Sequence, residues 1–333
     1  MSTSNKRIAR LAPISVVVVL ALLVPTFMAA STVSLVTKIL IFGLFVMALD
    51  LAFGYTGLWS FSHAAFFGVA AYTTAILITR FGITSFWLTV PAGIGIAAVT
   101  AALFAWVSLR MRGVYFLLIT LALGELIYTV CQKWEGLTGG TDGIFNVPYP
   151  KIGFGIEFNT TRFYYLVCVI VAICTLVLYL IVKSPFGVAL QGIRDNETRM
   201  RTLGYNTWLH KFVAFTVSGA FAGMAGILYV HYNGIIVPES VDMVASGFAT
   251  IILIIGGTGT LWGGLLGSAI VYLLSYFVSQ VTPARWPLIL GCCFVAAVML
   301  ARGGVYPQLV KLCRKLLDRL TRPQRREAEK SAP

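Results

Sequence analysis

Charged side chains are scarce in this sequence. Asp, Glu, Lys and Arg together make up 11% of its 333 residues, whereas hydrophobic residues make up 58%. A soluble domain of this length needs many more polar residues to cover its core. The composition therefore excludes a soluble globular protein and predicts that the chain lies in a lipid bilayer.

Residues that carry chemistry are also few. The sequence has three histidines, far apart, and six cysteines without a C-x-x-C pair. Most of the cysteines lie in apolar runs and are interpreted as small buried hydrophobic residues. The glycine-rich stretch GGTGTLWGG lacks the Gly-Lys-Ser/Thr of a phosphate-binding loop, and the chain has neither a catalytic triad nor an HExxH pair. The sequence therefore predicts no metal, no cofactor and no enzymatic activity.

The net charge of +13 is distributed unevenly along the chain. Nineteen basic residues and five acids lie in the segments expected on the inner side of the membrane, whereas the expected outer segments hold five of each. This asymmetry follows the positive-inside rule. The charge therefore requires no nucleic-acid partner, and both termini are expected in the cytoplasm.

Ten apolar stretches are long enough, or nearly so, to cross a bilayer, which takes about 20 helical residues. An even number of crossings places the basic clusters at both chain ends on one face. A cleaved signal peptide is the alternative for the first stretch, although its apolar run is longer than usual. The sequence thus predicts an all-α integral membrane fold with about ten transmembrane helices, at roughly 11–30, 33–53, 58–79, 84–109, 113–132, 163–182, 212–232, 243–261, 264–281 and 286–301.

These helices are expected to form one transmembrane domain over residues 1–301, followed by a basic cytoplasmic tail over 302–333. Two connecting loops are long, an outer one at 133–162 and an inner one at 183–211. Glycines and prolines in the outer loop favour an ordered, irregular cap.

The inner loop carries signals for two short helices. Ser184 followed by Pro185 is typical of a helix start, Asp195 or Asn196 is suited to cap a second helix, and Gly204 is suited to end it. We therefore expect two short helices at the inner surface.

The stretch GYTGLWSFSHAAFFGVAAY, residues 54–72, interrupts the apolar pattern. Unpaired backbone at membrane depth is tolerated only against protein or a water-filled cavity, and transporters use such broken helices to bind polar solutes. The stretch is therefore predicted to line a solute path, although close packing by small residues is an alternative. For the histidine a structural hydrogen bond is favoured over a solute contact. The predicted path residues are Gly54, Tyr55, Gly57, Ser60, Ser62 and His63.

Glu125 lies in the middle of a predicted span, where an ionised carboxylate is costly. A structural bond to a neighbouring helix is favoured, and a proton relay is the alternative. We also assign Glu125 to the path. Lys38 and Asp50 lie within another span, about 120° apart around the helix, and are expected near the membrane interfaces rather than paired.

Five stretches, in order, resemble the LivM-type permease of bacterial branched-chain amino acid ABC importers. They are residues 54–72, RGVYFLLITLALGEL at 112–126, LTGGTDG at 137–143, GIRDNETRMRTLGYN at 192–206 and GGTGTLWGGLLGS at 256–268. The chain departs from the family pattern at Leu58, Ser62, Ala70 and Gly264. The resemblance implies a core similar to the vitamin B12 importer type with inverted repeats.

The resemblance also implies partners and residue roles. The partners are a homologous second permease, two ATP-binding subunits and a solute-binding protein, in the bacterial cytoplasmic membrane. Inner-loop residues would couple to the ATPase, namely Arg194, Asp195, Asn196, Glu197, Arg199, Arg201 and Gly204. Outer residues Thr138, Asp142 and Glu239 would dock the binding protein.

The implied function is import of branched-chain or related amino acids. A urea or short-amide permease of the same superfamily is one alternative. A proton-coupled secondary transporter that uses Glu125 and Asp50 as carriers is another. The sequence leaves the solute, and a hetero- or homodimeric pairing of the permease, open.

Overall fold

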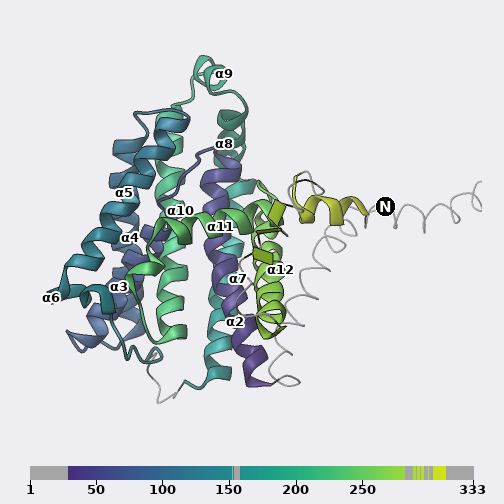
Figure 1. Ribbon diagram of the computed structural model, residues 1–333. Coiled ribbons are helices and arrows are strands. Elements are labelled where there is room, and N and C mark those ends of the chain that lie inside the picture. The colour runs from purple at the N-terminus through teal and green to yellow at the C-terminus, as the bar shows by residue number, and fades with distance from the viewer. Residues whose placement is uncertain are drawn as a thin grey trace, which may run out of the picture.

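A computed structural model describes residues 29–151, 153, 158–281, 288–289, 291–292, 294–295, 299 and 303–312. Every named element in this part of the chain is helical. Most of the long helices run between two ends of the molecule, with α9 at the top of Figure 1 and α6 at the lower left. The long helices are α2 (Ala30–Asp50), α4 (Phe86–Ser108), α5 (Val114–Lys133), α7 (Thr160–Lys183), α10 (Thr207–Asn233) and α12 (Leu261–Val281).

Shorter elements complete the bundle. The π-helical turn η1 (Leu51–Tyr55) extends α2, and α3 (His63–Thr79) and α11 (Met243–Gly256) are short apolar helices. The inner loop forms α8 (Pro185–Asp195) and α9 (Glu197–Thr202). The outer turns are α6 (Glu135–Thr138), η2 (Gly140–Asp142) and η3 (Pro238–Ser240).

Seven helical segments among the described residues are long and apolar enough to cross a membrane, namely the six long helices, with η1 counted as part of α2, and η3 taken together with α11 (Pro238–Gly256). This confirms an all-helical, multi-pass membrane protein. The predicted span at 58–79 begins only at His63 and is a helix of 17 residues, because the chain before it is not helical. The predicted spans at 11–30 and 286–301 lie wholly or mostly outside the described residues, so the number ten stays a prediction.

Helix α2 lies in the core of the bundle. Ile41, Leu44, Met47 and Leu49 are all 0% exposed, as expected for a helix that is hydrophobic on every side. It packs against α7, α10 and α12.

Helix α10 contacts α3 and α4 through a row of glycines. A Cβ added at Gly226 would lie 1.9 Å from the carbonyl oxygen of Phe67, and one at Gly223 would lie 2.5 Å from the Ala97 Cβ. One at Gly219 would meet Ala101 at 2.3 Å. Glycine is therefore needed at these positions for the backbones to approach each other, as is common between membrane helices.

Both long loops contain short helical elements. The inner loop forms the two short helices α8 and α9. The outer segment after α5 contains short helical turns, and its Ile144 pairs with Ile236, with N–O distances of 2.9 and 3.0 Å in the two directions. This pairing joins the outer segment to the turn that precedes α11.

Candidate functional site

The helix break lies where the sequence predicts it. Helix α2 passes into the π turn, Gly57 adopts φ +76°, and helical structure resumes only at His63. The amide of Gly57 donates to Phe53 O at 3.1 Å, whereas that of Leu58 reaches back to Ala52 O at 2.9 Å. Because a regular helix would pair Leu58 with Gly54, the Gly54 carbonyl is left free for another donor.

Most of the predicted path residues are buried. Tyr55, Ser60 and Ser62 are at most 8% exposed, and the hydroxyls of the two serines lie 2.9 Å apart. Gly54 is also buried, whereas Gly57 is exposed. The break therefore holds an inward hydrogen-bonded pair of serines, and its exposed backbone is at Gly57.

His63 makes a structural hydrogen bond, in agreement with the favoured interpretation. Its Nε2 lies 2.8 Å from the hydroxyl of Ser218, which in turn donates to the carbonyl of Ala48. The imidazole is 0% exposed and lies between the rings of Phe66 and Phe215, each at 5.5 Å. This arrangement ties α3 to α10 and α2. A contact between His63 and a solute stays a prediction.

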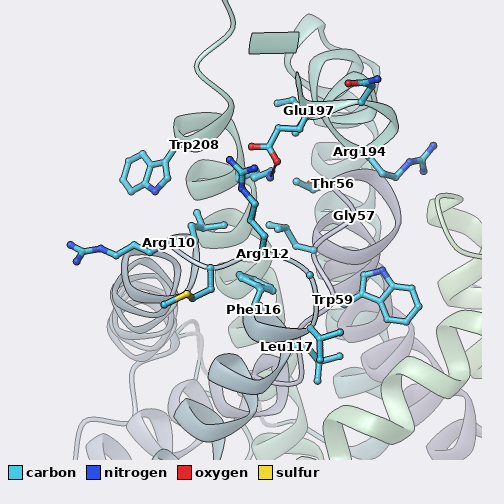
Figure 2. A pocket seen from close by; sticks show the side chains of 18 of the residues that line it. Thr56, Gly57, Trp59, Arg110, Arg112, Phe116, Leu117, Arg194, Glu197 and Trp208 are labelled. Carbon is cyan, nitrogen blue, oxygen red and sulfur yellow. Dashed lines mark hydrogen bonds and ion pairs between the residues drawn. The ribbon is translucent and has the colours of Figure 1, made fainter. Parts of the chain in front are cut away.

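A cavity of about 570 Å³ opens between the break and the inner loop. Figure 2 shows it between Gly57 of the break, Arg112 of the turn from α4 to α5, and Glu197 of the inner loop. Among the predicted path residues described above, Gly57 lines this cavity, together with Thr56, Leu58 and Trp59. The predicted coupling residues that line it are Arg194, Asp195, Asn196, Glu197 and Arg201. The cavity thus brings one predicted path residue, Gly57, together with five of the predicted coupling residues, whereas the other predicted path residues lie elsewhere.

Tyr55 faces a different cavity, of about 590 Å³, near the inner ends of α7 and α12. Lys183, Gln191 and Gly259 also line it. Tyr55 and Gly57 therefore line different cavities although they are two positions apart in sequence.

Glu125 is half-buried on α5, the least buried of the seven spanning helices. Its carboxylate has no hydrogen bond or ion pair within the described residues. The adjacent Gly124 faces the break, since a Cβ there would lie 3.5 Å from Phe61 O. The predicted structural bond to a neighbouring helix is therefore not formed within the described part of this chain.

The inner loop is capped as its sequence indicates. The Ser184 hydroxyl accepts from Gly187 N at 3.4 Å, and the Asn196 side chain accepts from Arg199 N at 2.9 Å. Asn196, and not Asp195, is thus the cap of α9. Gly204 follows α9 with φ +87°, which favours glycine.

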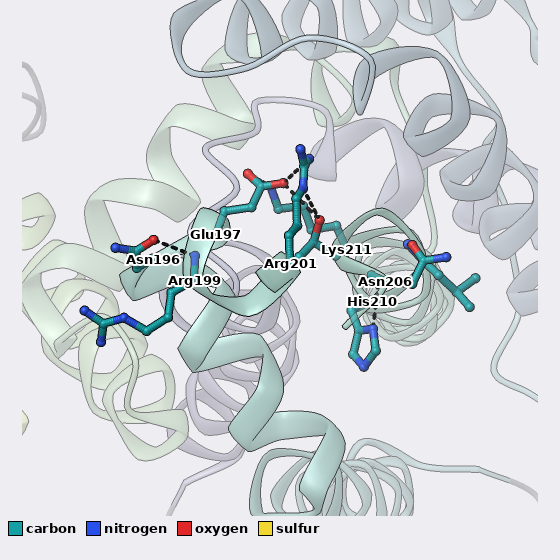
Figure 3. Close-up of polar contacts among 9 residues, drawn as sticks. Asn196, Glu197, Arg199, Arg201, Asn206, His210 and Lys211 are labelled. Carbon is teal, nitrogen blue, oxygen red and sulfur yellow. Dashed lines mark hydrogen bonds and ion pairs between the residues drawn. The ribbon is translucent and has the colours of Figure 1, made fainter. Parts of the chain in front are cut away.

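Glu197 fastens α9 to the start of α10. Its two carboxylate oxygens pair with Arg201 Nη2 and Lys211 Nζ, each at 2.7 Å, and Thr207 Oγ1 donates to it at 3.1 Å. Figure 3 shows this cluster, with Arg199 pointing away from it. Glu197 and Arg201 are thus bonded within the chain, and their contact with an ATP-binding partner stays a prediction. Glu197 keeps only 24% of its side chain exposed.

The pKa of Glu197 reflects this pairing. Partial burial acts to raise it, but the hydrogen bond and charge of Lys211, the Thr207 hydroxyl and the charge of Arg201 hold the pKa below its ordinary value. The ionised form is therefore favoured in the folded protein.

We expect this pairing to make stability depend on pH. A lowered pKa in the folded state stabilises the protein above the ordinary glutamate value near 4.5, and this contribution is lost as pH falls through the folded-state pKa. At pH 7, detergent-solubilised Glu197→Gln protein should have a melting temperature a few degrees below that of the unaltered protein, and this difference should narrow below about pH 4.5. A difference in melting temperature that stays constant down to pH 3.5 would contradict the stabilising role of the Glu197 charge.

Arg194 reaches from the end of α8 to the break. Its Nη1 donates to the free carbonyl of Gly54, and its Nε and Nη2 both lie 3.2 Å from Asp195 Oδ1. The arginine thus joins the predicted coupling loop directly to the predicted path.

Asp50 has a partner on a distant segment. It is 0% exposed, and its Oδ1 accepts from the amide of Gly259, in the turn between α11 and α12, at 2.7 Å. Lys38 instead lies over the ring of Tyr272, so the two charged residues of α2 do not pair with each other, as expected. The position of Asp50 near a membrane interface stays a prediction. The sequence shows the glycine-rich turn, which allows the backbone to come close, but nothing in it specifies Asp50 as the partner.

The three predicted docking residues differ in exposure. Asp142 and Glu239 are exposed on neighbouring outer turns. Thr138 is 5% exposed, and its hydroxyl donates to the carbonyls of Cys131 at 2.6 Å and Trp134 at 2.8 Å. Thr138 stabilises the end of α5 and offers no surface to a partner, which corrects the expectation for this residue.

Comparison with known proteins places these features in a family. The family described as branched-chain amino acid transport system / permease component matches residues 31–301. The chain is 30% identical over 277 residues to the high-affinity branched-chain amino acid transport system permease protein LivM of Escherichia coli, and 29% identical to that of Salmonella typhimurium. Each match covers 76% of this chain and 65% of the relative.

More distant relatives include a probable LivM permease of Methanocaldococcus jannaschii, 24% identical over 71% of this chain and 79% of the relative. The autoinducer 2 import system permease protein LsrC of Photorhabdus laumondii is 28% identical over 38% of this chain and 39% of the relative. No solved structure matches. The chain therefore belongs to the family of branched-chain amino acid transport permease components, a family of transport proteins and not of enzymes.

Proposed function

We propose that this chain is the transmembrane permease subunit of an ATP-driven importer for branched-chain or related amino acids. It works with a homologous second permease, two ATP-binding subunits and a solute-binding protein, and both its termini lie in the cytoplasm of a bacterium. Family membership supports the class of protein. The observation that carries the mechanism is the contact of Arg194, on the inner loop, with the broken helix at Gly54.

In this proposal the complete chain crosses the membrane ten times, with a core of the vitamin B12 importer type. The seven described spans support a multi-pass fold. The even number rests on the basic residues near both chain ends, which the positive-inside rule places on one side.

The solute path runs between this subunit and the second permease. Helices α4 and α5 are the least buried of the spanning helices, so they leave the most surface for a partner. Glu125 lies on α5 without a partner within the described residues, and α5 adjoins the break through Gly124. A carboxylate at this depth is stable where it faces water or a second protein.

The inner loop is the segment that the ATP-binding subunits contact and displace. The caps at Ser184 and Asn196 and the ion pairs of Glu197 stiffen its two short helices. Arg199 is exposed and points away from the cluster (Figure 3), and the side chain of Asp195, although paired with Arg194, is 70% exposed, so both can contact the partner. A stiff loop transmits displacement to the break through Arg194.

Reconstitution tests the function. The test uses vesicles that contain this chain together with the ATPase, the binding protein and the second permease encoded by neighbouring genes. These vesicles should accumulate leucine only when ATP is present on the cytoplasmic side. Vesicles with this chain alone should accumulate nothing, with or without a proton gradient. Accumulation by the chain alone, driven by a proton gradient, would favour the proton-coupled transporter. A panel of amino acids, urea and short amides, read as melting shifts of the binding protein, identifies the solute.

Replacing Glu125 by glutamine separates the two roles of this residue. Glutamine retains hydrogen bonding but cannot carry a proton at neutral pH. We expect uptake of the Glu125→Gln protein within about threefold of the original, at equal abundance in the membrane. Loss of uptake with normal abundance would instead indicate a proton carrier.

A further inference from the structure

The second cavity, of about 590 Å³, lies where the inner ends of α7 and α12 meet α8. Among the described residues that line it, Lys183 is the one charged side chain, and none is acidic. Tyrosine and tryptophan side chains form much of the rest of the wall, namely Tyr55, Tyr179, Trp262 and Tyr306. The cavity therefore combines a positive charge with aromatic and hydroxyl groups, which suits an anion such as phosphate.

Lys183 is available to a ligand. It is the last residue of α7, it is exposed, and it makes no ion pair within the described residues. Its Nζ lies 6.0 Å from the centroid of the Tyr179 ring, one helical turn earlier. Lysine at the end of a spanning helix, beside tyrosine and tryptophan, is typical of the level of the lipid headgroups.

The last described helix indicates the same level. Residues 305–312 form a helix that runs across the direction of the spans, in yellow at the right of Figure 1. Tyr306 on this helix lines the cavity, and a Cβ at Gly304 would lie 2.2 Å from the Cα of Gly257, in the turn before α12. Three of its apolar side chains are between 42% and 56% exposed, namely Leu309, Val310 and Leu312. An exposed apolar surface on a helix that lies across the spans is typical of a membrane interface.

An exposed apolar stripe on α7 leads to the cavity. Its side chains are between 55% and 57% exposed, namely Val169, Ile173, Leu176 and Leu180. Their spacing of three and four residues places them on one face of the helix, and Lys183 follows at the same spacing. A phospholipid matches this arrangement, because its acyl chains lie along the stripe while its phosphate reaches the cavity. A free anion would use the cavity alone.

We propose that this cavity binds the headgroup of an anionic phospholipid of the inner leaflet, with Lys183 as the cation for the phosphate. Basic pockets between spanning helices on the cytoplasmic side are suited to such headgroups. Phosphatidylethanolamine and phosphatidylcholine also carry an ammonium group, which would lie near Lys183 and find no carboxylate among the described lining residues. Phosphatidylglycerol has no such cation and is therefore preferred.

A bound headgroup also contacts the inner loop. Val188 and Gln191 line the cavity from α8, which begins two residues after Lys183. Phosphate held between α7, α8 and α12 should restrain α8. Anionic lipid then regulates the segment that couples to ATP hydrolysis, a consequence that rests on the proposed function, whereas the binding itself does not depend on it.

The first measurement is native mass spectrometry of the purified full-length protein, freed of lipid and then given phosphatidylglycerol, phosphatidylethanolamine or phosphatidylcholine with the same acyl chains. We expect retention of phosphatidylglycerol to exceed that of the other two by about fivefold, the factor expected for one lysine near an anionic headgroup. Lys183→Gln should abolish this preference without changing the retention of phosphatidylcholine. Lys183→Arg keeps the charge and should keep the preference.

Lys133→Gln is the matched control. Lys133 is the last residue of α5 and is exposed, as Lys183 is on α7, but it lines neither cavity described above. This variant should keep the preference for phosphatidylglycerol.

Hydrogen exchange then locates the bound lipid. Phosphatidylglycerol should slow exchange over residues 184–191 and 259–262 in the unaltered and Lys133→Gln proteins, and not in Lys183→Gln protein. Glycerol 3-phosphate has a phosphate but no acyl chains, and at the same concentration it should slow neither segment.

Four outcomes would overturn the proposal. Equal retention of the three lipids would exclude a site for anions, and preferred retention of phosphatidylcholine would show that the aromatic side chains hold a quaternary ammonium instead. A preference for phosphatidylglycerol that persists in Lys183→Gln protein would place the lipid elsewhere. Exchange that phosphatidylglycerol does not slow would show that another segment of the chain, such as the predicted span at 286–301, fills the cavity.

These measurements need neither ATP nor solute. Failure of the lipid site therefore leaves the proposed function standing, and a complex without ATP-dependent import would leave the lipid site standing.

Discussion

Replacing Gly226 by leucine is expected to remove folded protein from the membrane almost completely. The first atom of the new side chain would lie 1.9 Å from the carbonyl oxygen of Phe67, which belongs to helix backbone. Backbone does not yield as the end of a flexible side chain does, and α3 is further held to α10 by the bond between His63 and Ser218. The cost should exceed the ~1–3 kcal/mol typical of overpacked cores.

The measurement is the yield of monodisperse protein after solubilisation, read by fluorescence-detected gel filtration. Gly95→Leu is the matched control, because Gly95 is in α4, another spanning helix, and a Cβ there meets nothing within 4 Å. Its yield should stay within about twofold of the original. Equal yields of the two leucine variants would show that α10 and α3 do not approach as described.

Replacing Arg194 and Glu197 together by alanine is expected to abolish uptake while the protein stays folded. The first change removes the bond to Gly54, and the second removes the ion pairs to Arg201 and Lys211. The inner loop then loses its polar contacts with the break and with the start of α10, so we expect displacement of the loop to be transmitted poorly to the spans. We expect import to fall by about tenfold or more.

ATP hydrolysis and membrane abundance complete this experiment. Hydrolysis should continue without stimulation by the loaded binding protein, and abundance should be normal, because these contacts lie at the inner end of the protein and outside the packed core. Arg80→Ala removes an exposed basic residue at the end of α3, away from the loop contacts and from the cavity, and should leave uptake unchanged. If uptake and the stimulation of ATP hydrolysis are both unchanged in the double variant, the inner loop does not couple hydrolysis to transport.

Features with a local cause could be predicted from the sequence. The helix break follows from glycines and serines in an apolar run, since Gly57 supplies a positive φ and the serines bond to each other. The two inner helices follow from their caps at Ser184 and Asn196, which act within three residues.

Features that depend on distant segments could not be predicted. Asp50 finds its partner 209 positions away, at Gly259, and no periodicity of α2 indicates this. The same holds for Glu197, whose partner Lys211 belongs to the next helix, so that a charge expected to face a partner is used within the chain. Thr138 was expected at the surface because it lies in a glycine-rich loop, but its hydroxyl donates to carbonyls at the end of α5.

The glycine row of α10 and the chain of bonds from His63 through Ser218 to Ala48 have a consequence for motion. Backbones in direct contact cannot slide without a clash, and a buried hydroxyl bonded on both sides cannot be parted cheaply. Helices α2, α3, α4 and α10 are therefore expected to move as one rigid body. Relative motion among the described spans is expected instead at α5, the least buried of them.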